Sequence, residues 1–327
     1  MDIIKVVGRF NKVARGHPKR NVYKPSCIGL PMLIVITIPA YNEGKTLGGL
    51  IKEIKRVMDT SSYNFKYKVV VGDDGSTDDT PEVARIAGAV VVSHPRNMGL
   101  AETFRSEIKK SLELKADIIV HIDADGQYLP KEIPLLIKEV QKGSDLVLGS
   151  RFKGTIEHMP LVKRMGNRAF SRVISKITGL SISDGQTGFR AFTKDVAMRI
   201  TIISNHTYTQ EQIIKAAREK FRIKEVPVYF AKRNDKSRLI SNPLGYAIRA
   251  WINIVRIYRD YEPLRFFGMV GSLIFSIGFL LGLFLVYVQF FGDGINRHLG
   301  LIMLDVLVLS IGFQVIIFGF LADMQKK

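Results

Sequence analysis

Two long uncharged segments near the C-terminus constrain the fold of this chain more than any other feature. Residues 266–291 contain no charged side chain, and residues 299–322 contain only Asp305. Each segment exceeds the ~20 apolar residues that an α-helix needs to cross a bilayer. Because only residues 292–298 join them, we predict a hairpin of two transmembrane helices. A pair of buried soluble helices is the disfavoured alternative, since soluble helices of this length usually have a polar face.

The basic residues near the ends of these segments predict the orientation of the hairpin. Short cytoplasmic segments are enriched in Lys and Arg. The connecting loop contains only Arg297, whereas basic residues flank the outer ends of both spans at Arg249, Arg256, Arg259, Arg265, Lys326 and Lys327. We therefore expect a multi-pass protein of the cell membrane, with residues 1–265 and the C-terminus in the cytoplasm.

The charge balance indicates a polyanionic partner. The chain has 48 Lys and Arg against 30 Asp and Glu, a net charge of +18, which suits nucleic acid, an acidic membrane surface or phosphorylated substrates. Residues 1–30 form a basic arm in which apolar residues recur at helical spacing between positions 2 and 14. This segment is either an amphipathic helix on anionic lipid or a solvated arm. A single cysteine, Cys27, excludes an internal disulfide.

Short β-branched segments alternate with helical patterns between residues 31 and 240, which is typical of an α/β doubly wound domain. Their fully apolar composition suits a parallel sheet covered on both faces. We predict strands at 33–38, 68–72, 89–92, 117–122 and 145–148, and helices at 47–57, 81–87, 101–114 and 130–141. A further amphipathic helix is expected within residues 241–265, next to the membrane. Ligands of such sheets bind at the carboxyl ends of the strands.

Acidic residues follow three of these strands, in segments 39–43 (PAYNE), 73–78 (DDGSTD) and 123–127 (DADGQ). Acids gathered at one sheet edge repel one another unless a cation lies among them. Asp123 and Asp125, with the amide of Gln127, are hard oxygen ligands that suit Mg²⁺ or Mn²⁺ rather than zinc. An Asp-x-Asp alone is weak support for a metal site, but three such segments, each after a strand, are strong support.

These segments together resemble the family 2 glycosyltransferases, over about residues 32–240. Four further segments are similar to the dolichyl-phosphate mannose synthase and polyprenyl-phosphate glycosyltransferase branch: 149–151 (GSR), 186–190 (QTGFR), 225–227 (EVP) and 233–238 (RNDKSR). The resemblance implies a Rossmann-like GT-A fold and the transfer of one sugar to a polyprenyl or dolichyl phosphate. GDP-mannose is the first expected donor, and UDP-glucose or UDP-GlcNAc is the alternative.

The resemblance also implies roles for individual residues. Asp123 and Asp125 are expected to be catalytic together with Arg151, and Asp123, Asp125 and Gln127 would hold the metal ion. The donor nucleotide would contact Pro39, Ala40, Tyr41, Glu43, Asp73, Asp74 and Arg105. The acceptor phosphate would contact Arg151, Arg164 and Arg233, because an arginine fork binds phosphate through two hydrogen bonds. Lys163 and Arg168 are close enough in sequence to replace Arg164, and Glu211 resembles the acid of this branch.

The acceptor chemistry predicts an inverting transfer without an obligatory protein base. A phosphate monoester has a second pKa of about 6, so its oxygen is already an anionic nucleophile at neutral pH. Gly72 departs from the branch pattern, in which a β-branched residue is common before the paired acids, and so does the pair Asn234-Asp235. The less favoured alternatives are a processive polysaccharide synthase, a non-catalytic lipid-binding subunit and a nucleic-acid-binding membrane protein, and we expect no nucleic-acid partner.

Overall fold

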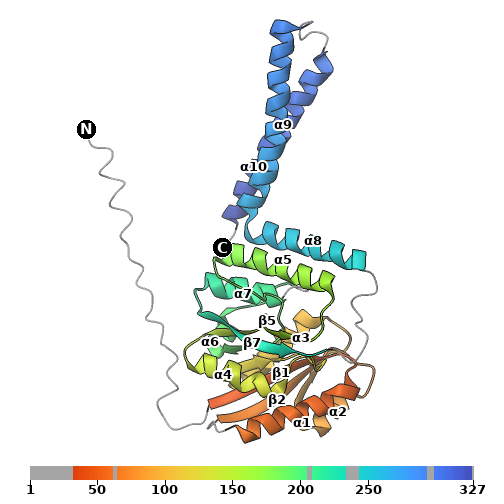
Figure 1. Ribbon diagram of the computed structural model, residues 1–327, viewed down its shortest axis with the longest axis vertical. Coiled ribbons are helices and arrows are strands. Elements are labelled where there is room, and N and C mark those ends of the chain that lie inside the picture. Colours follow the sequence, from red (N-terminus) through yellow and green to blue (C-terminus); the bar gives the residue numbers. More distant parts are fainter. Residues whose placement is uncertain (1–31, 62–64, 205–207, 233–242, 293–297, 326–327) are drawn as a thin grey trace, which may run out of the picture.

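The computed structural model describes residues 32–61, 65–204, 208–232, 243–292 and 298–325. An α/β domain lies at one end, and a helical hairpin extends away from it (Figure 1). The predicted arm helix at positions 2–14 and the predicted phosphate ligand Arg233 lie outside the described residues.

The domain is built on one seven-stranded sheet, with strand order β3-β2-β1-β4-β6-β5-β7. The strands are β1 (Met32–Ala40), β2 (Phe65–Asp73), β3 (Val90–Ser93), β4 (Ile118–His121), β5 (Leu146–Ile156), β6 (Arg190–Thr193) and β7 (Ile223–Phe230). All five predicted strands are present, with β1, β2 and β5 longer than expected. The two additional strands, β6 and β7, begin within or just before segments that the family resemblance had singled out.

The sheet is mixed, so the expectation of a parallel sheet is wrong for one strand. Strands β1, β2, β3 and β4 pair in parallel, and β5 pairs in parallel with β7, but β6 is antiparallel to both β4 and β5. The first residue of β6, Arg190, pairs with His121, the last residue of β4, so the chain enters β6 at the edge where β4 ends. A strand that starts from that edge must run back through the sheet, which makes it antiparallel to its neighbours.

Helices cover both faces of the sheet, and each face has its own apolar core. One core includes residues of α1 (Gly44–Thr60), α2 (Thr80–Ile86) and α4 (Ile133–Gln141), the last preceded by a 3₁₀ turn at Pro130–Glu132. The other includes residues of α3 (Leu100–Glu113), α5 (Leu161–Thr178), α6 (Lys194–Arg199) and α7 (Tyr208–Arg218). In α1 the buried residues are Leu47, Leu50, Ile51, Ile54 and Met58, the spacing expected of an amphipathic helix.

The C-terminal part of the chain consists of α8 (Pro243–Tyr261), α9 (Pro263–Phe291) and α10 (Leu299–Met324). Helix α8 lies beside α5 (Figure 1), where Lys176 packs over the Tyr258 ring, and Ile257 enters the core. Helices α9 and α10 pack closely at Gly271 and Gly312, which have no Cβ. A Cβ at either position would come within 3.0 Å of the facing helix. Both helices are long and apolar enough to cross a membrane, and little of either is buried inside the structure.

Candidate active site

Segments after β1 and β2 meet at one edge of the sheet. The register pairs Pro39 with Gly72 and Ala40 with Asp73. The turn after β1 is fastened to the turn after β2, since the Asn42 amide nitrogen donates to Ser76 Oγ at 3.0 Å and the Thr77 amide donates to Asn42 Oδ1 at 2.8 Å. Two predicted nucleotide-binding segments are therefore one continuous surface, as the strand order requires.

The paired acids at the end of β2 are buried and hold loops in place. Both carboxylate oxygens of Asp74 accept backbone hydrogen bonds from the loop before α3, one from Met98 at 2.8 Å and one from Gly99 at 2.9 Å. Asp73 Oδ1 accepts the Ser76 amide at 3.0 Å. Gly75 has a φ of +71°, and a Cβ there would lie 2.4 Å from the Arg96 backbone, so the turn requires glycine. A contact between Asp74 and a nucleotide base stays a prediction.

The two acids after β4 differ in environment. Asp123 is half-buried. Desolvation, and next the charge of Asp125, raise its pKa to about 7, against the opposing charges of Arg151, Arg190 and Lys163. Its carboxylate lies against Gly188, where a Cβ would come within 2.3 Å of Asp123 Oδ2. Asp125 Oδ1 accepts the Gln127 amide at 3.1 Å. Burial and the neighbouring carboxylate both favour the neutral form of the Asp123 carboxyl. A divalent cation bound between the two acids would offset both effects.

The ligand chemistry of this pair fits a hard cation that keeps water and phosphate oxygens in its coordination shell. Within the described part of the chain, no group of three or more His, Cys, Asp and Glu side chains could hold a metal by itself. The side-chain amide of Gln127 donates to the Ala231 carbonyl oxygen at 3.1 Å, which fixes its orientation. Asp123 and Asp125 would then be the protein's carboxylate ligands, with Gln127 Oε1 the remaining predicted ligand.

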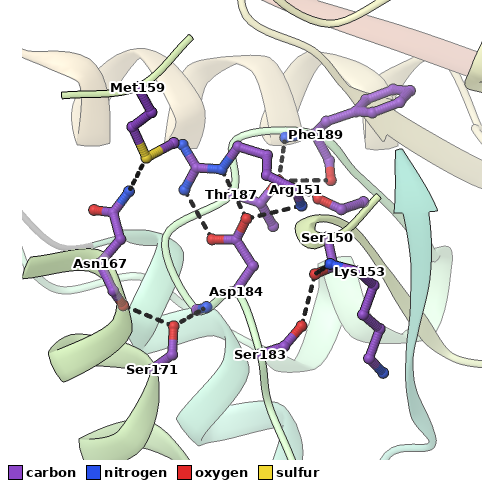
Figure 2. Close-up of polar contacts among 12 residues, drawn as sticks. Ser150, Arg151, Lys153, Met159, Asn167, Ser171, Ser183, Asp184, Thr187 and Phe189 are labelled. Atoms are coloured by element: carbon purple, nitrogen blue, oxygen red, sulfur yellow. Dashed lines mark hydrogen bonds and ion pairs between the residues drawn. The ribbon is translucent and has the colours of Figure 1, made fainter. Parts of the chain in front are cut away.

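The predicted catalytic arginine lies on β5 and is tied to an acid that sequence reasoning missed. Arg151 is 5% exposed, and its Nε and Nη2 donate to the two oxygens of Asp184 at 2.7 and 2.8 Å (Figure 2). The guanidinium also lies over the Phe230 ring, 5.1 Å from its centroid. Nearby, the Thr187 hydroxyl donates to the Gly149 carbonyl oxygen at 2.7 Å, so the segments 149–151 and 184–189 form one buried unit.

The other predicted cations have different surroundings. Arg105 forms an ion pair with Glu102 and donates to the carbonyl oxygens of Ile202 and Ser204. Arg164 lies on the exposed surface of the first turns of α5. Lys163, on the preceding position, is partly buried, and its charge acts on Asp123. Of the alternatives left open for the acceptor phosphate, Lys163 is therefore the one whose charge acts on Asp123.

Comparison with protein families identifies this arrangement. A family model described as "Glycosyl transferase family 2" matches residues 35–201 of the 327-residue chain. The chain belongs to glycosyl transferase family 2. The predictions of a family 2 glycosyltransferase and of a Rossmann-like GT-A fold are thereby confirmed.

Several curated relatives resemble this glycosyltransferase over most of their own length. A dolichyl-phosphate hexose transferase of Haloferax volcanii is 30% identical over 66% of this chain and 90% of that protein. The UDP-N-acetylglucosamine–dolichyl-phosphate N-acetylglucosaminyltransferase of Methanococcus voltae is 31% identical over 60% of this chain and 84% of that protein. An undecaprenyl-phosphate mannosyltransferase of Micrococcus luteus is 27% identical, covering 72% and 98%.

A solved structure shares the fold. Glucosyl-3-phosphoglycerate synthase from Mycobacterium tuberculosis, in a complex with Mn²⁺, UDP-glucose and phosphoglyceric acid, aligns with a TM-score of 0.52. The match covers 68% of this chain and 79% of that chain at 20% sequence identity. At this identity the likeness establishes the fold of the family 2 domain.

Sequence reasoning missed several buried polar residues that support the site of this glycosyltransferase. Arg190 is fully buried and donates to the carbonyl oxygens of Thr187 and Thr209. Glu225 accepts the backbone amides of Ser183 and Asp184, both at 2.9 Å. Arg190 and Glu225 lie in the segments 186–190 and 225–227, whose resemblance to the polyprenyl-phosphate glycosyltransferase branch was the one indication of their importance in the sequence. Asp184 lies just outside those segments.

The acid Glu211 on α7 also has a structural role that the pattern did not indicate. Its two carboxylate oxygens accept the amides of Ile203 at 2.9 Å and Ser204 at 2.8 Å, and Lys215 forms an ion pair with it. Arg105 reaches the carbonyl of the same Ser204. Glu211 therefore binds the backbone amides of the segment after α6, and Arg105 binds its backbone carbonyl oxygens.

Proposed function

We propose that this enzyme transfers one sugar from a nucleotide-sugar donor to the phosphate of a polyprenyl or dolichyl phosphate at the cytoplasmic face of the membrane. One observation carries the proposal: the acidic pair Asp123 and Asp125 follows a strand, and the charges of Arg151, Arg190 and Lys163 act on Asp123. The domain that holds them is joined to two membrane-length helices. A dolichyl or undecaprenyl phosphate is named in the descriptions of three relatives. GDP-mannose is our first donor, and UDP-glucose or UDP-GlcNAc is the alternative.

The proposed reaction needs alignment rather than proton removal. An ionised lipid phosphate is already a nucleophile, so the protein has to hold its oxygen in line with the anomeric carbon, opposite the nucleotide. Attack from that side inverts the anomeric configuration. Arg151, with Lys163 or Arg164 and with Arg233, would hold the phosphate, because cationic donors lower the repulsion between it and the donor diphosphate.

The donor would lie along the surface formed after β1 and β2. Pro39, Ala40, Tyr41 and Glu43, together with Asp73 and Asp74, would contact the nucleoside, and Arg105 the diphosphate. Asp123, Asp125 and Gln127 would hold Mg²⁺ or Mn²⁺, which when bound neutralises charge on the departing nucleoside diphosphate. Tyr41, 37% exposed, presents an aromatic surface suited to such a contact.

The placement of α8 supports delivery of the acceptor at the membrane surface. Helix α8 runs from Pro243 to Tyr261 immediately before α9 and lies between the domain and the hairpin (Figure 1). Its Ile248, Trp251 and Ile252 are exposed, and such side chains favour the interface between lipid head groups and acyl chains. A head group held at this depth is close to the domain that would glycosylate it.

Transfer of radiolabelled sugar to a polyprenyl phosphate in membranes tests the proposal. GDP-mannose, UDP-glucose and UDP-GlcNAc are compared with and without Mg²⁺ or Mn²⁺. We expect one donor to give an acid-labile monosaccharyl lipid that requires the metal and is lost in Asp125→Ala. Asp195→Ala, which removes an exposed acid of α6, is the matched control and retains activity. Polymer-length products, or no lipid product from any donor with folded protein, would overturn the proposal.

A further inference from the structure

A buried ion pair beside the site joins β5 to the segment before β6. Asp184 is 0% exposed and accepts three hydrogen bonds from one residue, Arg151: from the backbone nitrogen at 3.0 Å, from Nε at 2.7 Å and from Nη2 at 2.8 Å (Figure 2). The two side-chain bonds form the planar, paired geometry in which an arginine is held most firmly by a carboxylate. The contact therefore fixes both the position and the rotation of the guanidinium.

Asp184 is itself held by the surrounding chain. Its amide donates to Glu225 Oε1 at 2.9 Å, and the next amide, of Gly185, donates to Ser171 Oγ at 3.0 Å. Figure 2 shows Asp184 between the Arg151 guanidinium and Ser171 of α5. Strand β7 and helix α5 thus anchor Asp184 through separate hydrogen bonds, and Asp184 passes this rigidity to Arg151.

This pair is an inefficient way to stabilise a core, which points to another use. Removing two charges from water costs about as much as their attraction returns, and apolar side chains of similar volume often stabilise a protein equally well. What a bidentate pair does provide is a guanidinium in one orientation, with Nε and Nη2 occupied and the Nη1 edge facing away from Asp184. The positive charge of Arg151 also acts on Asp123, at the proposed metal edge.

We propose that Asp184 is a positioning residue for the transfer reaction: it orients Arg151 so that the Nη1 edge of the guanidinium meets the acceptor phosphate. The inference rests on the proposed function. Asp184 takes no part in bond making. Because Asp184 already holds the Arg151 side chain in one orientation, Arg151 loses less conformational entropy when it binds phosphate.

Kinetics of single and double variants test this role. Asp184→Asn keeps the shape and removes the charge, so we expect the KM for polyprenyl phosphate to rise about tenfold or more, the worth of one charge-assisted hydrogen bond. The KM for the sugar nucleotide should change little. Arg151→Lys should raise the same acceptor KM, and the double variant should be no worse than the more impaired single variant, because both changes disrupt one contact.

A matched pair elsewhere in the sheet supplies the control. Asp145 Oδ2 also accepts the backbone amide and Nε of one arginine, Arg222, but Asp145 directly precedes β5, whereas Arg151 lies in the middle of that strand. Asp145→Asn should leave the acceptor KM unchanged. The inference is wrong if Asp184→Asn leaves the acceptor KM unchanged, raises both KM values equally, or adds in full to Arg151→Lys.

A binding measurement separates failure of this inference from failure of the proposed function. Titration calorimetry of the full-length protein in detergent with a short-chain prenyl monophosphate needs no turnover. Weaker binding by Asp184→Asn, with a wild-type melting temperature, supports the inference even if no sugar is transferred, and equal binding overturns it. If Asp184→Asn fails to fold, the double variant Asp184→Asn with Arg151→Gln takes its place, because it removes both charges of the pair. We expect the double variant to fold and to show the same weakened binding of the prenyl phosphate. Wild-type affinity in the double variant would likewise overturn the inference.

Discussion

At the scale of single residues, Gly188 sets the position of a proposed metal ligand. An added Cβ would lie 2.3 Å from Asp123 Oδ2 and 2.6 Å from Oδ1, so the Asp123 carboxylate must move in the Gly188→Ala variant. We expect transfer activity to fall about 10- to 100-fold, the usual effect of disturbing a group that supports a metal ligand. Metal titration of the activity should show a higher half-saturating concentration, while far-UV circular dichroism stays unchanged.

A glycine without neighbours provides the comparison for that variant. Gly49 lies on the exposed face of α1, and a Cβ there would meet nothing within 4 Å. Gly49→Ala should increase the free energy of unfolding by about 1 kcal/mol through helix propensity and leave activity unchanged. Equal activity in Gly188→Ala and Gly49→Ala would refute a supporting role for Gly188.

The buried carboxyl of Glu107 predicts a pH-dependent stability. Burial raises its pKa well above the usual value of 4.5, against weaker opposing effects of the Gly72 amide and Thr37. Its Oε2 lies 3.2 Å from His121 Nδ1, but burial also lowers the pKa of His121 to about 3, so both groups are held neutral. Because the folded state binds the Glu107 proton more tightly, this group favours folding below pH 4.5, and the contribution is lost as pH rises through the folded pKa.

Glu107→Gln should therefore stabilise the protein at high pH. We expect its free energy of unfolding to exceed that of the wild type by about 1–3 kcal/mol at pH 8, because the wild-type carboxyl must take up a proton on folding or be buried with its charge. The difference should shrink toward pH 5. Unfolding of the detergent-solubilised protein at both pH values measures it. Glu113→Gln, an exposed acid of the same helix, should show no such trend. A gain for Glu107→Gln that is equal at both pH values would contradict the argument.

At the scale of elements, the first five strands could be predicted because their apolar runs are continuous and short. Strand β6 has four residues and begins with the buried Arg190, and β7 alternates buried and more exposed residues with a proline inside. Neither has the apolar run that identified the others. Their burial depends on pairing with β4 and β5, which is a tertiary effect that a single-sequence pattern does not contain.

The candidate site divides in the same way. Residues that follow strands directly, such as Asp74 and Asp123, could be placed at one edge because parallel strands end together. Asp184 could not, because its partner Arg151 lies 33 positions earlier and nothing local marks the pair. The departure at Gly72 has a structural reason as well: a Cβ there would lie 2.7 Å from Glu107 Oε1, so this chain has room for a carboxyl where a larger residue would block it.

At the scale of the whole molecule, helix α8 and its contacts connect the domain to the two membrane-length helices. Helix α8 contributes Ile257 to the core of the domain and continues into α9 after one residue, Glu262. Arg218 of α7 lies over the Tyr261 ring and donates to the Tyr261 carbonyl oxygen at 2.8 Å. The orientation of the hairpin in the membrane therefore fixes the side on which the domain lies.

The proposed orientation predicts which positions reagents can reach from outside the cell. Basic residues flank the outer ends of the hairpin and only Arg297 lies in its loop, so the loop should be external and the domain cytoplasmic. In a Cys27→Ser background, Asn296→Cys should react with a membrane-impermeant maleimide in intact cells. Gln325→Cys, just after α10, should react only after the membrane is opened. Labelling of Gln325→Cys in intact cells, with Asn296→Cys protected, would reverse the orientation and remove the domain from the cytoplasmic supply of sugar nucleotides.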